Sequence, residues 1–164
     1  PKCALVASHV ELIDESGKLT GYWKADLETD TSEKIRKRLP FENCIAHPTV
    51  LFRNTIADHY LYDPVQKNTE DYDIWLRLAS DNLVLCKIPE KLVRLRIHPT
   101  SITSSSRKAA QGSDVIRCKV RYLAAQLRKG KISFFNLKVL FYLIVNCLSW
   151  PLNNILLNNR FFMK

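Results

Sequence analysis

The sequence predicts an α/β domain followed by a helical tail rich in basic and hydrophobic residues. Over residues 3–97, apolar segments of strand length alternate with helix-start signals. The chain has 164 residues, of which 46% are hydrophobic and 25% charged. This length and composition are typical of one compact domain, and they exclude collagen-like, low-complexity and wholly disordered chains.

The charge is divided unevenly along the chain. Residues 1–106 carry 14 Lys and Arg against 15 Asp and Glu, a net of −1, whereas residues 107–164 carry 11 against 1, a net of +10. Basic residues interleaved with Leu, Phe and Tyr are typical of segments that bind an anionic membrane surface or nucleic acid. The Ser/Thr-rich stretch 100–106 is the expected linker between the two parts.

Five cysteines lie far apart, and no two of them form a C-x-x-C pair. They are Cys3, Cys44, Cys86, Cys118 and Cys147. This odd number predicts neither a zinc knuckle nor a disulfide framework, and it fits a reduced, cytosolic compartment best. The chain opens on Pro1 without a signal-peptide pattern, and a strand-like segment follows at once, so we expect the beginning of the protein to be absent from it.

Local signals predict the elements of the first part. Residues 3–13 are apolar with partial alternation and lead into the turn signal 14–17, which predicts a strand and a tight turn. Thr31 or Ser32 is expected to cap a short helix that ends near Leu39. An acid in its first turn and basic residues in its last turn match the helix dipole. We interpret its basic run as a solvated helix face rather than an anion-binding patch.

The next segments predict a strand, a longer helix and two more strands. Residues 45–52 are apolar, but Pro48 cannot donate to a strand ladder, so an edge strand or a bulge is expected. Residues 68–71 have the composition of a helix start, with acids in the first turn. The apolar face expected to follow is Ile74, Trp75, Leu78 and Ala79. Two short strands are predicted at 83–88 and 92–97.

In the tail, Ser113 is expected to cap a basic amphipathic helix. Its predicted apolar stripe is Ile116, Val120, Leu123, Ala124 and Leu127. Residues 132–157 are strongly apolar but interrupted by polar residues, so they offer no clean window of about 20 uncharged residues for a spanning helix. We interpret the tail as a pair of interfacial helices, with packing against an absent partner as the alternative.

Three stretches, in order, carry a family resemblance. They are AHPTVLFR at 46–53, TEDYDIWLRL at 69–78, and LRIH at 95–98 with Ser101-Ile102 after it. Together they resemble the acceptor half of a family 2 inverting glycosyltransferase of the GT-A fold. The resemblance covers roughly residues 1–106, and it implies the C-terminal part of this Rossmann-like nucleotide-diphospho-sugar transferase fold, without the nucleotide-binding half. Residues 107–164 would form a separate membrane-associated tail.

The resemblance implies a transferase that moves a sugar from a nucleotide-diphosphate donor to a cell-surface glycan or lipid-linked acceptor, with inversion. Such a reaction needs a carboxylate within hydrogen-bond reach of the acceptor hydroxyl to take its proton. We predict that Asp71 is this base, in a first helical turn where the dipole favours the ionised form. Glu70 is expected to orient the loop or touch the acceptor, and Asp73 is expected to face solvent. In an unrelated sequence the same pair would indicate only acidic helix capping.

Three further residues are candidates for binding. The resemblance implies a divalent cation, Mn²⁺ or Mg²⁺, and a neutral His98 would be one ligand of it. The alternative is a histidine that ends a strand and bonds to backbone. Arg96 and His47 are the candidate substrate-binding residues, Arg96 by balancing diphosphate charge and His47 by holding the edge strand beside the acceptor cleft.

Two motifs of the family are absent. No D-x-D motif occurs before Ala46, and Asp71-Tyr72-Asp73 matches it only by letters. The isolated chain is therefore expected to bind its donor poorly and to be inactive alone. A Q-x-x-R-W pattern like that of processive synthases is also absent, which favours addition of one sugar at a time in polysaccharide biosynthesis of the cell envelope.

The expected location is cytoplasmic, peripheral on the inner face of the plasma membrane. Residues 107–164 would contact the anionic surface where lipid-linked acceptors are presented, and no nucleic-acid partner is expected. Two alternatives stay open. One is a non-catalytic module whose basic tail binds a membrane or nucleic acid. The other is a degenerate transferase remnant without activity.

Overall fold

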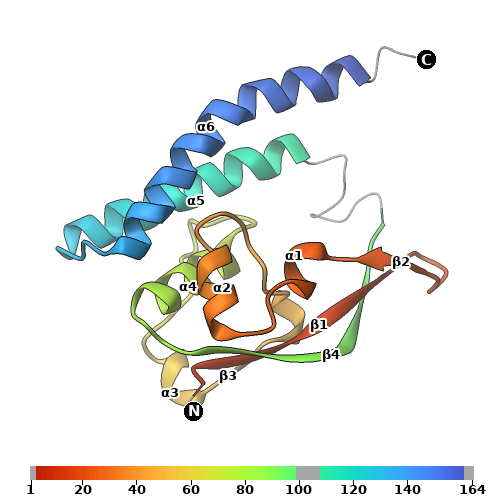
Figure 1. Cartoon of the computed structure of the whole chain (residues 1–164), viewed down its shortest axis with the longest axis horizontal. Coiled ribbons are helices and arrows are strands. Elements are labelled where there is room, and N and C mark those ends of the chain that lie inside the picture. The colour runs from red at the N-terminus through yellow and green to blue at the C-terminus, as the bar shows by residue number, and fades with distance from the viewer. Residues whose placement is uncertain (1–2, 99–107, 161–164) are drawn as a thin grey trace.

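The computed structural model describes residues 3–98 and 108–160 (Figure 1). The strands are β1 (Leu5–Ile13), β2 (Leu19–Tyr22), β3 (Leu51–Phe52) and β4 (Leu85–Arg96). The helices are α1 (Lys24–Leu27), α2 (Ser32–Arg38), the 3-10 helix η1 (His47–Thr49), α3 (Asn54–Ala57), α4 (Glu70–Ser80), α5 (Lys108–Arg128) and α6 (Phe134–Arg160). The chain is a mixed α/β structure, as predicted, and its last two described elements are helices.

A mixed sheet is built around β1. Strand β4 runs parallel to β1 along its whole length, from the pair Leu5↔Leu85 to the pair Ile13↔Arg96. Strands β2 and β3 pair antiparallel with the end and the start of β1. The two strands predicted at 83–88 and 92–97 are in fact one strand, because register shifts beside His9 absorb the extra residues around Pro89.

The segment 45–52 differs from its prediction. Only Leu51 and Phe52 form a strand, and the residues before them form η1 with Pro48 in its first turn. Proline favours this position because its fixed φ suits a helical turn and its missing N–H would be unpaired there anyway. The predicted edge strand is therefore a short helix that leads into a two-residue strand.

The predicted helix starts at 31–32 and 68–71 are confirmed. The Thr31 side chain caps α2 by accepting a hydrogen bond from the Lys34 backbone N–H at 3.3 Å. Helix α4 begins at Glu70 without a side-chain cap at Thr69. Asn68 enters it with a left-handed φ of 62°, which an asparagine adopts more readily than most residues. The expected apolar face of α4 is buried.

The core lies between the sheet and the helices. Helix α4 contributes its largest side chains, Trp75 and Tyr72, both fully buried. Figure 1 shows α5 and α6 on the far side of α2 and α4 from the sheet. Cys118 and Tyr122 of α5 and Phe135 and Val139 of α6 belong to the same core cluster. The two tail helices therefore pack on the first part of the chain.

Helix α5 differs from its prediction in start and orientation. It begins at Lys108, so Ser113 lies inside it, and the predicted linker 100–106 is outside the described residues. Three residues of the expected apolar stripe, Val120, Ala124 and Leu127, are exposed. The buried residues of α5 are instead Asp114, Cys118, Lys119, Tyr122 and Gln126. Packing against the domain decides which face is inward, and a buried polar group is tolerated there once it is hydrogen-bonded.

Among the residues that the structure describes, no helix is both long enough and apolar enough to cross a membrane.

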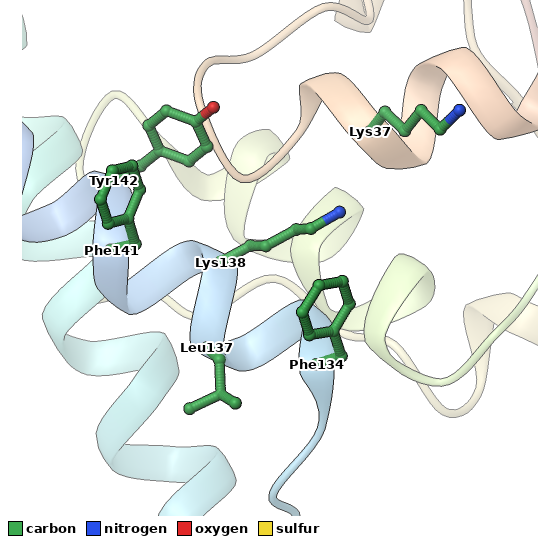
Figure 2. Close-up of a pocket in the computed structure, with 6 residues that line it drawn as sticks. All are labelled: Lys37, Phe134, Leu137, Lys138, Phe141 and Tyr142. Carbon is green, nitrogen blue, oxygen red and sulfur yellow. The ribbon is translucent and has the colours of Figure 1, made fainter.

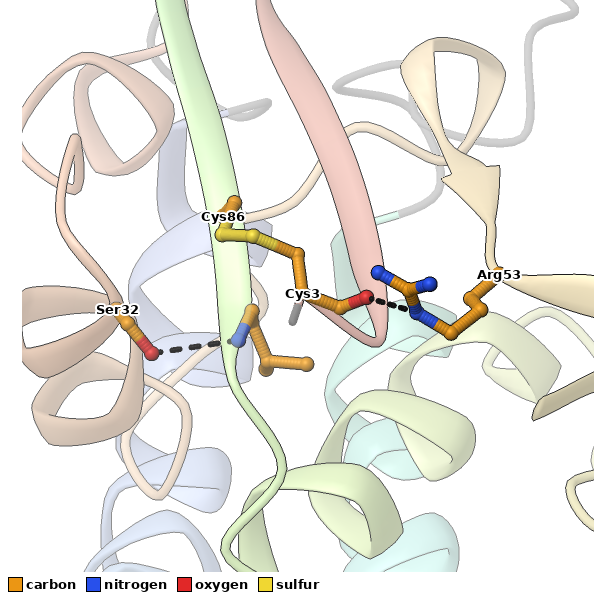
Figure 3. The surroundings of a disulfide bond; sticks show 5 residues. Cys3, Ser32, Arg53 and Cys86 are labelled. Carbon is orange, nitrogen blue, oxygen red and sulfur yellow. Dashed lines mark hydrogen bonds between the residues drawn. A yellow bond between two sulfur atoms is a disulfide. The ribbon is translucent and has the colours of Figure 1, made fainter. Parts of the chain in front are cut away.

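The cysteines were expected to be reduced and without a disulfide framework, and this prediction is wrong for one pair. Cys3 and Cys86 are bonded, with their Cα atoms 5.9 Å apart (Figure 3). The parallel pairing of β1 with β4 brings the start of β1 beside Cys86 although 83 positions separate the two cysteines, which is why spacing along the chain gave no signal. The backbone carbonyl of Cys3 also accepts a hydrogen bond from Arg53 Nε at 2.9 Å.

Candidate functional site

The first turn of α4 places Asp71 beside the loop that carries Asn43. Its Oδ2 accepts a hydrogen bond from Asn43 Nδ2 at 3.1 Å, and its Oδ1 accepts one from the Tyr72 backbone N–H at 2.7 Å. The buried apolar face of α4 anchors the helix in the core, so the half-buried carboxylate is held from both sides. Asp71 is therefore a fixed, partly accessible carboxylate, which is the geometry that a general base requires.

Asn43 is one of two residues of this site, with Tyr62, that the sequence did not indicate. Its Oδ1 accepts a hydrogen bond from the Ile45 backbone N–H at 3.1 Å, while its Nδ2 donates to Asp71. Both ends of the amide are thus occupied, and this fixes which end faces the carboxylate. Asn43 and Asp71 are 28 positions apart, and a single asparagine in a loop carries no signal of such a contact.

The pKa of Asp71 is raised above that of an ordinary aspartate. Burial is the largest cause, because it penalises the charged form. The hydrogen bonds from Tyr72 and Asn43 and the nearby His47 oppose this rise, and the negative charge of Glu70 adds to it. A carboxylate whose pKa moves toward the working pH is a stronger base while it stays ionised.

His47 and Tyr62 form the exposed border of the site. His47 Nε2 and Tyr62 Oη share a hydrogen bond of 2.8 Å, and the two rings meet edge to face. Burial and the negative charges of Asp71 and Glu70 raise the pKa of Tyr62, so both carboxylates act on this hydroxyl. The structure thus brings together Glu70, Asp71 and His47, three of the predicted site residues, and it adds Tyr62 and Asn43.

Asp73 has a different role from its neighbours. We expected it to face solvent, but it is buried and accepts a hydrogen bond from Arg77 Nε at 2.8 Å, one helical turn later. Pairing with Arg77 makes burial of this carboxylate tolerable. Of the two aspartates at 71 and 73, Asp71 therefore belongs to the site, whereas Asp73 is buried on the inner side of α4.

Arg96 is the last residue of β4, and His98 lies two positions after it. Arg96 Nη1 donates to the backbone carbonyl of Asp14 at 2.8 Å and also to that of Glu15, so it holds the turn between β1 and β2. His98 follows the strand and is half-buried. The hydrogen bonds of Arg96 are therefore to this turn and not to Asp71.

The described residues do not form the divalent-cation site that the resemblance implies. Within residues 3–98 and 108–160, no group of three or more His, Cys, Asp or Glu side chains is arranged to hold a metal ion. His98 would supply a single ligand to such a site, whereas Mn²⁺ and Mg²⁺ take several, with carboxylate oxygens among them.

Two curated proteins are similar to this chain. The O-antigen biosynthesis glycosyltransferase WbnJ of Escherichia coli is 34% identical over 104 residues, which cover 62% of this chain and 39% of that protein. The uncharacterized glycosyltransferase MJ1057 of Methanocaldococcus jannaschii is 29% identical over 93 residues, which cover 57% and 31%. No protein-family model matches the chain, and no solved structure matches it. The chain spans less than two fifths of either relative, and both support a glycosyltransferase role for it.

Proposed function

We propose that the chain is the acceptor-side part of a family 2 inverting glycosyltransferase of the GT-A fold. The enzyme would transfer a sugar from a nucleotide-diphosphate donor to a glycan or lipid-linked acceptor in polysaccharide biosynthesis. The likeness to two glycosyltransferases supports the class of reaction. The observation that carries the proposal is Asp71, a half-buried carboxylate held by two hydrogen bonds at a helix start, with a raised pKa.

In the proposed reaction, Asp71 takes the proton of the acceptor hydroxyl. The acceptor oxygen forms a bond to the anomeric carbon, the bond from that carbon to the diphosphate breaks, and the diphosphate leaves with the electron pair. Each carboxylate oxygen of Asp71 already accepts one hydrogen bond and retains capacity for another, so the acceptor hydroxyl can dock without displacing Asn43 or Tyr72. Fixing the base in this way supplies orientation as well as basicity.

The other predicted residues have proposed roles around this step. His47 and Tyr62 present polar groups at the border of the site and would contact hydroxyls of the acceptor sugar. Glu70 would orient the acceptor beside Asp71. On the donor side, Arg96 would face the diphosphate, and His98 would be one ligand of a divalent cation whose other ligands lie outside the described residues.

The proposed location is the inner face of the plasma membrane, with the enzyme cytoplasmic and peripheral. The +10 net charge of residues 107–164 supports attraction to an anionic surface. A transferase held there would meet lipid-linked acceptors at high local concentration.

The proposed reaction is tested by the configuration of its product. The complete enzyme that contains this chain is incubated with nucleotide-diphosphate sugars of known anomeric configuration and a lipid-linked glycan acceptor, and the new linkage is assigned by proton NMR. We expect a linkage of the opposite configuration to the donor. A retained configuration would contradict the inverting mechanism, and the absence of product with every donor would favour a remnant without activity.

The contact between Asn43 and Asp71 predicts a pH effect. The Asn43 hydrogen bond favours the ionised carboxylate, so Asn43→Ala should raise the pKa of Asp71 further. The base is active when ionised, so the acid limb of kcat/KM should move to higher pH, by about 1 pH unit for one charge-assisted hydrogen bond. The measurement is the pH profile of kcat/KM for both proteins.

A second variant separates this effect from simple structural damage. Asn43→Asp keeps an oxygen for the Ile45 N–H and places a second acid beside Asp71, so the acid limb should move further than in Asn43→Ala. Equal loss of rate at every pH in both variants, with the limb unmoved, would show that Asn43 only stabilises its loop.

A further inference from the structure

The face of α6 that meets the protein carries two asparagines as well as the buried Phe135 and Val139. Asn136 is buried, and its Oδ1 accepts hydrogen bonds from Tyr122 Oη at 2.5 Å and Ser80 Oγ at 3.3 Å. Further along the same helix, Asn146 Oδ1 accepts a hydrogen bond from the fully buried Lys119 at 2.7 Å. Two asparagines thus point inward from an otherwise apolar helix.

The opposite face of α6 carries large apolar side chains that are exposed. They are Phe134, Leu137, Phe141, Ile144 and Leu148, with exposed fractions between 52% and 73%. Their spacing of three and four residues places them in one stripe along the helix. We call these five residues the α6 stripe. Apolar side chains are not expected on the face of a helix that meets water, and a contiguous exposed stripe of this kind marks a docking surface.

Two lysines border the α6 stripe. Lys138 of α6 and Lys37 of α2 line a surface pocket of about 370 Å³ together with Phe134, Leu137, Phe141 and Tyr142 (Figure 2). The Lys138 ammonium lies 4.6 Å from the centre of the Phe134 ring, and Lys37 pairs with Glu33 at 2.6 Å. The pocket therefore combines apolar side chains with cationic tips, which is the arrangement of an interfacial helix on lipid.

Charge decides between a lipid surface and a second copy of the chain. Residues 134–160 contain no Asp or Glu, and residues 107–164 carry a net charge of +10. Two copies meeting along α6 would bring Lys138 of each copy together, and the nearby Glu33 carboxylate is already paired with Lys37. An anionic bilayer instead complements the lysines and accommodates the apolar stripe.

We propose that the α6 stripe docks on the surface of an anionic lipid bilayer, with Lys37 and Lys138 at the headgroups. This assigns the contact to one face of α6 and one lysine of α2, rather than to the stripe predicted on α5. The inference rests on the proposed function only for its biological role, because a lipid-linked acceptor would be presented at the membrane surface. Binding to vesicles does not depend on donor or acceptor, so the two proposals fail separately.

Flotation of the full chain with vesicles tests the proposal. Binding is measured with vesicles of phosphatidylglycerol and phosphatidylcholine mixed, and with vesicles of phosphatidylcholine alone. We expect binding to the anionic vesicles that weakens with salt, and a loss of more than about tenfold in the double variant Phe141→Gln with Leu148→Gln. Lys138→Gln should weaken binding about fivefold.

A matched control keeps the test specific. Leu51 of β3 is 75% exposed, close to the 70% of Leu148, and Figure 1 shows β3 on the side of the molecule away from α6. Leu51→Gln should leave vesicle binding within about twofold of the original chain. Circular dichroism of each variant confirms folding, and exposed positions are chosen so that the fold persists.

Three outcomes would overturn the proposal. The first is vesicle binding that the double variant leaves unchanged. The second is a dimer in analytical ultracentrifugation that the double variant converts to a monomer, which would make the α6 stripe an interface between copies. The third is salt-dependent binding to single-stranded oligonucleotides without binding to anionic vesicles, which would favour a nucleic-acid partner.

Discussion

Replacing Asp71 with asparagine is expected to lower the turnover of sugar transfer by about 10²–10⁴-fold, the usual contribution of a general base. Asparagine has nearly the same shape but cannot take the acceptor proton. Its single amide oxygen can keep only one of the two hydrogen bonds that Asp71 accepts from Asn43 and Tyr72, but the buried apolar face of α4 still anchors the helix, so the local fold should persist. The measurement is kcat and KM for donor and acceptor in the active protein, with donor affinity expected to change little.

Glu70→Gln is the matched control for this prediction. It removes the neighbouring carboxylate on the same helical turn, and it should cost less turnover than Asp71→Asn because Glu70 orients the acceptor rather than taking its proton. If Glu70→Gln were the more damaging change, the roles of the two acids would have to be exchanged. Wild-type turnover in Asp71→Asn would remove Asp71 from the mechanism.

Replacing Lys87 with methionine is expected to lower the free energy of unfolding by about 3–5 kcal/mol, the usual cost of breaking a buried ion pair. The Lys87 ammonium is fully buried and donates to Asp26 Oδ1 at 2.8 Å, to Thr29 Oγ1 at 3.0 Å, and to the backbone carbonyls of Asp26 and Cys44. The variant leaves the buried Asp26 carboxylate without its cation. Urea unfolding followed by circular dichroism measures the loss.

Two controls show whether the cost comes from the unpaired charge. The double variant Lys87→Met with Asp26→Asn should be more stable than Lys87→Met alone, because the uncompensated carboxylate is gone while an amide remains for His9 and the Val10 N–H. Lys34→Met, which breaks an exposed pair with Asp30, should leave the urea midpoint almost unchanged. A loss below about 1 kcal/mol for Lys87→Met would show that this pair behaves like a surface one.

Elements with local signals were predicted well from the sequence. The strand at 3–13 and its turn depend on alternation and on Asp14, whose side chain accepts hydrogen bonds from the Ser16 and Lys18 backbones. The helix start near Thr31 depends on a cap that acts within one turn. Such features are decided by neighbouring residues, so their sequence patterns are sufficient.

Features decided by distant partners were predicted poorly. The single strand β4 exists because β1 pairs with it on both sides of Pro89, and the inward face of α5 is set by Asn68 and Asn136, which hydrogen-bond Asp114 and Tyr122. The candidate site shows the same division. Sequence patterns indicated Asp71 and His47, but Asn43 reaches Asp71 only through the fold, and the buried Asp73 was mistaken for a solvated acid.

The pH dependence of sugar transfer tests the central claim most directly. If Asp71 is the base, kcat/KM in the original protein should fall on the acid side at a pH above the ordinary pKa of an aspartate, because burial raises the pKa of this carboxyl. The residual activity of Asp71→Asn should lack that acid limb. An acid limb that persists unchanged in Asp71→Asn would assign the proton transfer to another group and contradict the account.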